Sequence, residues 1–149
     1  MKPHRLLPPA VLLVSILLMT LFHLLLPVLK LNLTGLGALG AVFLSLGIVI
    51  NLVADNAFKQ NETTVKPFQE SSVLITKGIF RWSRNPMYLG FVLMIAGIAL
   101  ILGSLTPFLV VIGLPVFLQQ YYIIHEEKLL EQTFKTSWIQ YKSQVRRWI

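Results

Sequence analysis

The sequence has no cysteine and few charged residues, which make up only 13% of its 149 residues. The absence of thiols excludes disulfide bonds, thiolate metal sites and cysteine nucleophiles. The scarcity of charge, together with a hydrophobic content of 55% and a mean hydropathy of +0.71, excludes an ordinary soluble domain. We therefore expect an integral membrane protein.

Four apolar stretches approach the length of about 17 to 25 residues that crosses a bilayer as a helix. They run from about Leu6 to Leu26, Leu36 to Val53, Pro86 to Leu102 and Pro107 to Ile124. Lys2 and Arg5 precede the first stretch as in a signal peptide, but no small-residue cleavage site closes it, so we expect the helix to be retained. These stretches predict an all-α integral membrane fold with four transmembrane helices.

The chain is expected to form a single domain, residues 1–149, in three parts. A first helical hairpin covers 1–53, a polar cytoplasmic or interfacial segment covers 54–85, and a second hairpin with a C-terminal helix covers 86–149. The turn Gly103 to Thr106 is short, so the third and fourth helices should be antiparallel neighbours. Residues at intervals of three or four predict an amphipathic C-terminal helix lying on the cytoplasmic membrane surface: Leu130, Phe134, Trp138, Tyr141, Val145 and Trp148.

The few charges are unevenly signed, with 13 lysines and arginines against six acids. If both termini are cytoplasmic, Lys30 is the only one of those 13 cations on the outside, which agrees with the positive-inside rule. A one-sided basic surface favours anionic lipid headgroups. We expect a multi-pass protein with the lipid bilayer as partner and no nucleic acid.

Two further motifs have a structural interpretation. The run Gly35 to Gly40 matches a dinucleotide-binding pattern but lacks the strand and turn that this pattern requires. We interpret Gly37 and Ala41 as small residues that let the second helix approach a neighbour. His125 adjoins Glu126 and Glu127, but three consecutive residues cannot all face one ion on a helix, so we expect no metal site.

The most informative segment runs from Gly78 to Gly90, at the start of the third helix. Asn85 is typical of a helix cap, and Pro86 of a first helical position. These structural roles do not explain Tyr88 and Gly90, which follow just inside the helix. The antiparallel hairpin should bring Glu126 and Glu127 close to this segment. Their negative charges oppose the dipole at this end of the helix, so we expect a cationic group to neutralise them. The resulting pocket would suit a zwitterionic ligand with a further positive centre.

From about Thr64 to Ile149 the sequence resembles the isoprenylcysteine carboxyl methyltransferase family and its phospholipid methyltransferase relatives. The resemblance lies in four segments: 74–80, 84–90, 126–127 and 134–148. It implies S-adenosylmethionine as cofactor, bound without a Rossmann fold. It also implies cofactor-binding roles for Ser72, Val73, Leu74, Ile75, Phe80, Asn85, Pro86, Met87 and Tyr88.

We further expect Arg84, Asn85 and Tyr88 to hold the methionine carboxylate, and Glu126 or Glu127 to bind the ammonium or ribose. Gly78 and Gly90 would allow close backbone approach. An acceptor carboxylate needs no base, whereas an amine or hydroxyl would need Glu126 or Glu127 as general base. The family often has an arginine before position 145, associated with the substrate carboxylate. Here that position holds Gln144, and Arg146 or Arg147 would substitute from a neighbouring position. We expect Gln144, Arg146 and Trp138 to bind the substrate.

The sequence thus predicts transfer of a methyl group from S-adenosylmethionine to a lipophilic, membrane-embedded acceptor, with a carboxylate as one option. The short four-helix chain favours a prokaryotic inner membrane. Two alternatives remain open. One is an NADPH-dependent membrane reductase of the sterol reductase type, and the other is a non-catalytic small membrane protein.

Overall fold

The computed structural model describes residues 6–31, 35–63 and 71–149, and over these ranges it contains helices and no strand. Lys2, Arg5 and Lys66, which are expected on the cytoplasmic side, lie outside these ranges. The helices are α1 (Pro8–Leu25), α2 (Leu36–Gln60), the 3-10 helix η1 (Gly78–Arg81), α3 (Pro86–Leu102), α4 (Phe108–Leu118), the π-helical η2 (Gln119–Ile123) and α5 (Ile124–Gln144). The predicted all-α class is confirmed.

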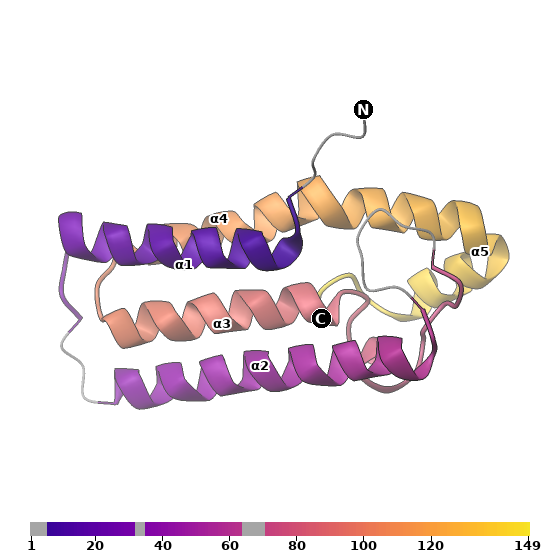
Figure 1. The fold of residues 1–149 in the computed structure, drawn as a ribbon, viewed down its shortest axis with the longest axis horizontal. Coiled ribbons are helices and arrows are strands. Elements are labelled where there is room, and N and C mark those ends of the chain that lie inside the picture. Colours follow the sequence, from indigo (N-terminus) through magenta and orange to yellow (C-terminus); the bar gives the residue numbers. More distant parts are fainter. Residues whose placement is uncertain (1–5, 32–34, 64–70) are drawn as a thin grey trace.

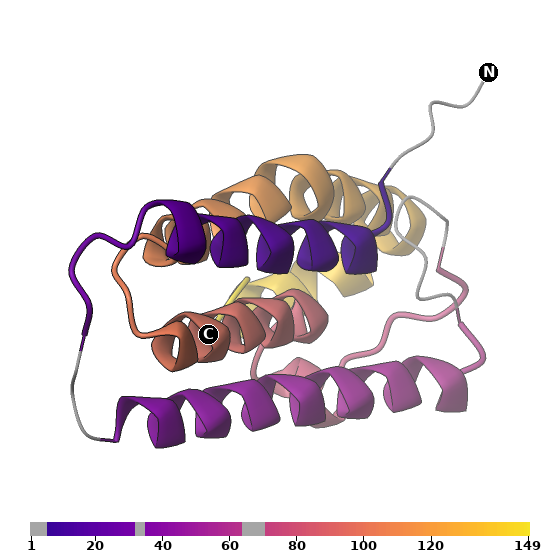
Figure 2. The same cartoon turned by 60° about the vertical axis from the view of Figure 1, so that its left-hand side comes forward.

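Three helical stretches in the described residues are long and apolar enough to cross a membrane: α1, α2 and Phe108–Gln144, which comprises α4, η2 and α5. α3 is a shorter apolar helix of 17 residues. Figure 1 shows the four running side by side, with α3 between α2 on one side and α1 and α4 on the other. The same layers are seen after rotation in Figure 2. The protein is therefore built as an integral membrane protein.

The structure confirms that α3 and α4 are antiparallel neighbours. The predicted first hairpin has a different form, because α3 lies between α1 and α2. α2 also continues past the predicted end at Val53 to Gln60. A Lys59–Asp55 ion pair of 2.6 Å, four residues apart, supports this extra length. The extension brings Phe58 to the site described below.

Glycines set the close packing of α2 against α3. A Cβ added at Gly40 would lie 2.6 Å from the carbonyl oxygen of Gly97, and one added at Gly47 would lie 2.6 Å from that of Gly90. Such backbone approach between membrane helices requires small residues. The role predicted for Gly37 and Ala41 was wrong. Both are exposed, and a Cβ at Gly37 meets no atom within 4 Å, because the seam lies on a different face of α2.

The predicted single amphipathic C-terminal helix was also wrong. Lys135 has φ 45° and ψ −113°, which breaks the helix inside α5. The chain turns back there toward the start of α3 (Figure 1). As a result Trp138 and Tyr141, expected on the lipid-facing stripe, are 1% and 6% exposed and face the protein interior.

Candidate active site

A cavity of about 360 Å³ lies at the end of the bundle where α3 begins. Its walls come from the start of α1, the end of α2, the segment before η1, the start of α3 and both halves of α5. Most of the predicted cofactor residues line it: Val73, Leu74, Ile75, Phe80, Asn85, Pro86, Met87 and Tyr88. Arg84, Glu126 and Trp138 line it as well. The third helix and the two segments flanking it therefore converge on one concave site.

Local backbone geometry builds the aromatic side of the cavity. Gly78 has φ +63°, a conformation that favours glycine, and it starts the short helix η1 that carries Phe80. Phe80 meets the ring of Phe58 edge-to-face at 5.5 Å. Its carbonyl oxygen accepts a hydrogen bond of 2.7 Å from the Tyr141 hydroxyl. This bond joins the returning half of α5 to η1.

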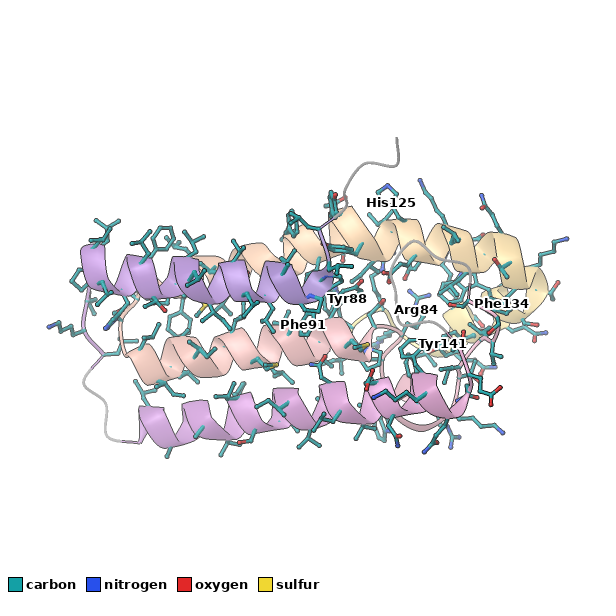
Figure 3. All side chains as sticks on the ribbon, in the orientation of Figure 1. Arg84, Tyr88, Phe91, His125, Phe134 and Tyr141 are labelled. Atoms are coloured by element: carbon teal, nitrogen blue, oxygen red, sulfur yellow. The ribbon has the colours of Figure 1, made fainter. Side chains whose placement is uncertain are left out.

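Tyr88 and Glu126 join α3 to α5 across the cavity. The Tyr88 hydroxyl donates a hydrogen bond of 2.6 Å to Glu126 Oε1, and Tyr88 is only 7% exposed. The predicted meeting of the glutamate pair with the start of α3 is confirmed. Figure 3 shows Tyr88, Arg84 and Tyr141 at this end of the bundle and His125 on the outer side of α5.

Arg84 is the most unusual side chain of the site. Its side chain is 7% exposed, and Nη2 pairs with Glu127 Oε1 at 3.1 Å. Its guanidinium lies 5.5 Å from the ring centroid of Trp138, a distance typical of a cation–π contact. Within the described residues, Arg84 Nε, Arg84 Nη1 and Trp138 Nε1 are buried without a hydrogen-bond partner. Because such donors are normally satisfied, these three need an acceptor beyond the described residues, such as water or a ligand.

The C-terminal segment that follows α5 is hydrogen-bonded to the residues just before α3. Arg147 forms a two-pronged pair with Glu127, with Nε–Oε1 at 3.0 Å and Nη2–Oε2 at 2.7 Å. Its carbonyl oxygen accepts a bond of 3.0 Å from Asn85 Nδ2, and the Arg84 N–H donates to the Arg146 carbonyl at 3.1 Å. The hydrogen bond from Arg147 to Glu127 raises the pKa of Arg147 above its ordinary value. Glu127 is thus neutralised by two guanidinium groups.

The side chain of Asn85 does not cap α3 as expected. Asn85 precedes the helix, but its side chain makes no cap bond. It donates to the Arg147 carbonyl oxygen instead. Pro86 does open the helix, as predicted. Gly90 does not open space for a ligand either, since its missing side chain is filled by Asn51 and Gly47 of α2.

Five predicted site residues lie outside the cavity lining: Ser72, Gly78, Glu127, Gln144 and Arg146. Glu127 is 6% exposed and lies behind Arg84. Gln144 and Arg146 are exposed. Their roles in binding stay predictions, whereas Arg147 makes the inward contact instead of Arg146.

Several lining residues had not been expected: Phe58, Phe91, Leu129, Leu130, Thr133 and Tyr141. Tyr141 could have been identified as an aromatic residue of the C-terminal amphipathic pattern, but that pattern was expected to face the lipid. Phe58 carried none, because it lay in a segment expected to be outside the helices.

Comparison with known proteins agrees with this architecture. A family model described as phospholipid methyltransferase matches residues 36–137. A solved structure of the eukaryotic intramembrane Ras methyltransferase ICMT (isoprenylcysteine carboxyl methyltransferase) superposes with a TM-score of 0.66 at 23% identity, covering 95% of this chain and 50% of that one. This chain thus spans about half the length of that protein, with which it shares its fold. Comparison with curated proteins found no match. The chain belongs to the phospholipid methyltransferase family.

Proposed function

We propose that this protein transfers a methyl group from S-adenosylmethionine to a lipophilic acceptor in the membrane. The observation that carries the proposal is Arg84, a buried cation that lines the cavity and whose Nε and Nη1 have no hydrogen-bond partner among the described residues. A guanidinium forms charge-assisted hydrogen bonds to a carboxylate, such as that of the methionine part of the cofactor. Trp138, whose indole N–H also lacks a partner among the described residues, lines the same cavity.

The cavity also suits the rest of the cofactor. Its ammonium or ribose would bind the Glu126 carboxylate, which faces the cavity beside Tyr88. The adenosyl group would lie against Val73, Leu74 and Ile75, as the family resemblance implies. Aromatic rings attract cationic centres through their faces, so Tyr88 and Phe80 suit a neighbouring sulfonium.

The bound cofactor would supply a methyl group attached to a positively charged sulfur. The protein's part is to hold the acceptor atom in line with that carbon, and such positioning can contribute about 7 to 11 kcal/mol. A carboxylate acceptor is deprotonated at neutral pH and needs no base. For an amine or hydroxyl acceptor we propose Glu126 as the base, since Glu127 lies behind Arg84 and is held by two guanidiniums.

We also propose that the cavity opens toward the cytoplasm of a prokaryotic cell, with both termini on that side. The distribution of Lys and Arg supports this orientation. The water-soluble cofactor would then enter from the cytoplasm, and the acceptor would enter from the bilayer.

Calorimetry of the detergent-solubilised protein with S-adenosylmethionine and NADPH, side by side, tests the proposal. We expect S-adenosylmethionine alone to bind, with Tyr88→Ala and Arg84→Met abolishing binding and Arg146→Ala, at an exposed position outside the cavity, leaving it unchanged. Binding of NADPH instead would favour a membrane reductase. Binding of neither would overturn an enzymatic assignment.

A further inference from the structure

A single residue with a strained backbone divides α5 into two halves. Lys135 has φ 45° and ψ −113°, a combination that is unfavourable for every residue with a Cβ atom and that favours glycine. Such strain persists only where surrounding contacts hold it, and it is concentrated at sites that clamp a ligand or change conformation. Lys135 itself is exposed and lies outside the cavity lining. The reason for the bend therefore lies in the residues that follow it.

Residues 136–149, which we call the arm, form part of the cavity wall. The arm supplies Trp138 and Tyr141, which are 1% and 6% exposed. Tyr141 donates its hydroxyl hydrogen bond to the Phe80 carbonyl oxygen, and Arg147 pairs with Glu127. These contacts hold the arm against the cavity, and they keep Lys135 in its strained conformation.

One ion pair can form only while the helix is bent. Lys142 Nζ of the arm lies 3.6 Å from Glu131 Oε2 of the first half of α5, with the two side chains 44% and 50% exposed. In a straight α-helix these two residues would lie about 16 Å apart along the axis, too far for an ion pair. Neither residue lines the cavity. The pair therefore favours the docked arm without touching a ligand.

The docked arm leaves buried hydrogen-bond donors without partners on two separate segments. Trp138 Nε1 belongs to the arm, whereas Arg84 Nε and Nη1 belong to the segment before α3, and none of them has a partner among the described residues. The Arg84 guanidinium lies 5.5 Å from the Trp138 ring centroid. Buried donors without acceptors destabilise a structure. A ligand group that accepted hydrogen bonds from both residues would remove this cost and would join the arm to α3.

The same residues have a second favourable arrangement. Phe134, Trp138 and Tyr141 recur every three or four residues, so a straight α5 would carry them on one face. A helix with such a face and with lysines such as Lys135 and Lys142 beside it binds the surface of a membrane. The local sequence thus favours a straight helix and the tertiary contacts favour a bent one, which is the condition for an element with two states.

We propose that the arm pivots at Lys135, docking against the cavity when the cofactor binds and moving to the membrane surface when the cofactor leaves. This rests on the proposed function, because S-adenosylmethionine is the ligand that would join Arg84 to Trp138. The hydrogen bonds of the arm to Phe80, Asn85 and Glu127 then form in the docked state only. Cofactor binding and completion of the cavity wall are one coupled equilibrium.

Distances between two spin labels, measured in lipid nanodiscs, test the movement. Because the chain has no cysteine, Asn56→Cys on α2 and Ile139→Cys on the arm place the labels at two exposed positions outside the cavity lining. We expect two distances without S-adenosylmethionine and only the shorter one when it saturates. Asn56→Cys with Lys128→Cys is the matched control, since Lys128 is exposed on the first half of α5 and its distance should stay constant. A single distance from the arm pair under both conditions would overturn the proposal.

Two substitutions at Lys135 test the pivot without any cofactor. Glycine relieves the strain at φ 45° and is unfavourable in a straight helix, so Lys135→Gly should raise the fraction of the shorter distance about twofold or more. Lys135→Ala removes the same charge but keeps the Cβ atom and favours a helix, so it should not raise this fraction. Equal fractions in the two variants would refute the pivot. If the wild type binds no S-adenosylmethionine the proposed function fails, and this comparison still decides whether the arm moves.

A charge swap tests the coupling of the arm to the cofactor. Lys142→Glu replaces attraction to Glu131 by repulsion in the docked state, and we expect it to weaken S-adenosylmethionine binding about threefold in calorimetry. Lys142→Glu combined with Glu131→Lys should restore the wild-type affinity. Unchanged affinity in the single variant, or no recovery in the double variant, would show that docking of the arm is not coupled to the cofactor.

Discussion

The Tyr88 hydroxyl donates a hydrogen bond of 2.6 Å to Glu126 Oε1, and this bond joins the first turn of α3 to α5 across the wall of the cavity. Hydrogen bonds to a charged partner are shorter and stronger than neutral ones. The bond therefore fixes the direction of the Glu126 carboxylate, and Glu126 is the one glutamate among the described residues that lines the cavity. It also links ligand binding to the packing of the two helices.

Tyr88→Phe removes only the donor of this bond. We expect a loss of about 1.5 to 3 kcal/mol in the free energy of unfolding, the usual contribution of a hydrogen bond to a charged group, and weaker binding of S-adenosylmethionine. Thermal unfolding in detergent and calorimetry would measure the two effects. Trp82→Phe is a suitable control, because Trp82 is an aromatic residue that is 78% exposed and lies outside the cavity lining. Equal effects of the two variants would contradict the role given to Tyr88.

Arg84→Lys separates charge from geometry. Lysine can still pair with Glu127, but a single ammonium lacks the further N–H donors that the planar guanidinium keeps beside the cavity. We expect the variant to fold and its affinity for S-adenosylmethionine to fall at least tenfold, about 1.4 kcal/mol. Calorimetry would measure this fall, with Arg81→Lys as the control, since Arg81 is exposed and outside the cavity lining. Full affinity in Arg84→Lys would show that the unpartnered N–H groups do not bind the ligand.

The sequence predicted those parts of the structure that depend on local patterns. The long apolar runs and the short turn at Gly103 were enough for the membrane helices and for the antiparallel pairing of α3 and α4. That pairing in turn placed Glu126 beside Tyr88. The turn from Asn85 to Tyr88 was found through its residues and their resemblance to a family.

The remaining features depend on contacts between distant segments. The break at Lys135 has no proline or glycine to announce it, and it reverses the direction in which Trp138 and Tyr141 face. Arg146 and Arg147 are chemically identical neighbours, so only the extended backbone after Gln144 decides which one meets Glu127. These arginines were expected to bind the substrate, so the sequence predicted neither the pairing of an arginine with Glu127 nor which of the two makes it.

The pairing of Glu127 with Arg147 and not with Arg146 gives a sharp test. Arg147→Ala removes both hydrogen bonds to Glu127, whereas Arg146→Ala changes an exposed side chain and keeps the backbone carbonyl that binds Arg84. We expect Arg147→Ala to cost about 2 to 3 kcal/mol in unfolding free energy, less than a fully buried pair because Arg147 is partly solvated. Arg146→Ala should cost nothing measurable. A double-mutant cycle with Glu127→Gln would assign the loss to this pair, and additive effects would contradict it.

The close packing of α2 against α3 at their glycines gives the last test, which concerns the helices that support the site. A Cβ at Gly97 would lie 2.5 Å from the Gly40 carbonyl oxygen and 2.6 Å from the Leu44 nitrogen, both backbone atoms of α2 that cannot rotate away. Gly97→Ala must therefore push α2 from α3, and we expect a loss of about 1 to 3 kcal/mol in unfolding free energy, as for overpacked cores. Gly37→Ala places the same methyl group in open space, so it should be neutral or slightly stabilising through helix propensity. Unfolding in detergent compares the two, and a Gly97→Ala variant as stable as Gly37→Ala would show that α2 and α3 do not pack through this seam. Because α2 also carries Phe58 to the cavity, the Gly97→Ala variant should bind S-adenosylmethionine more weakly as well.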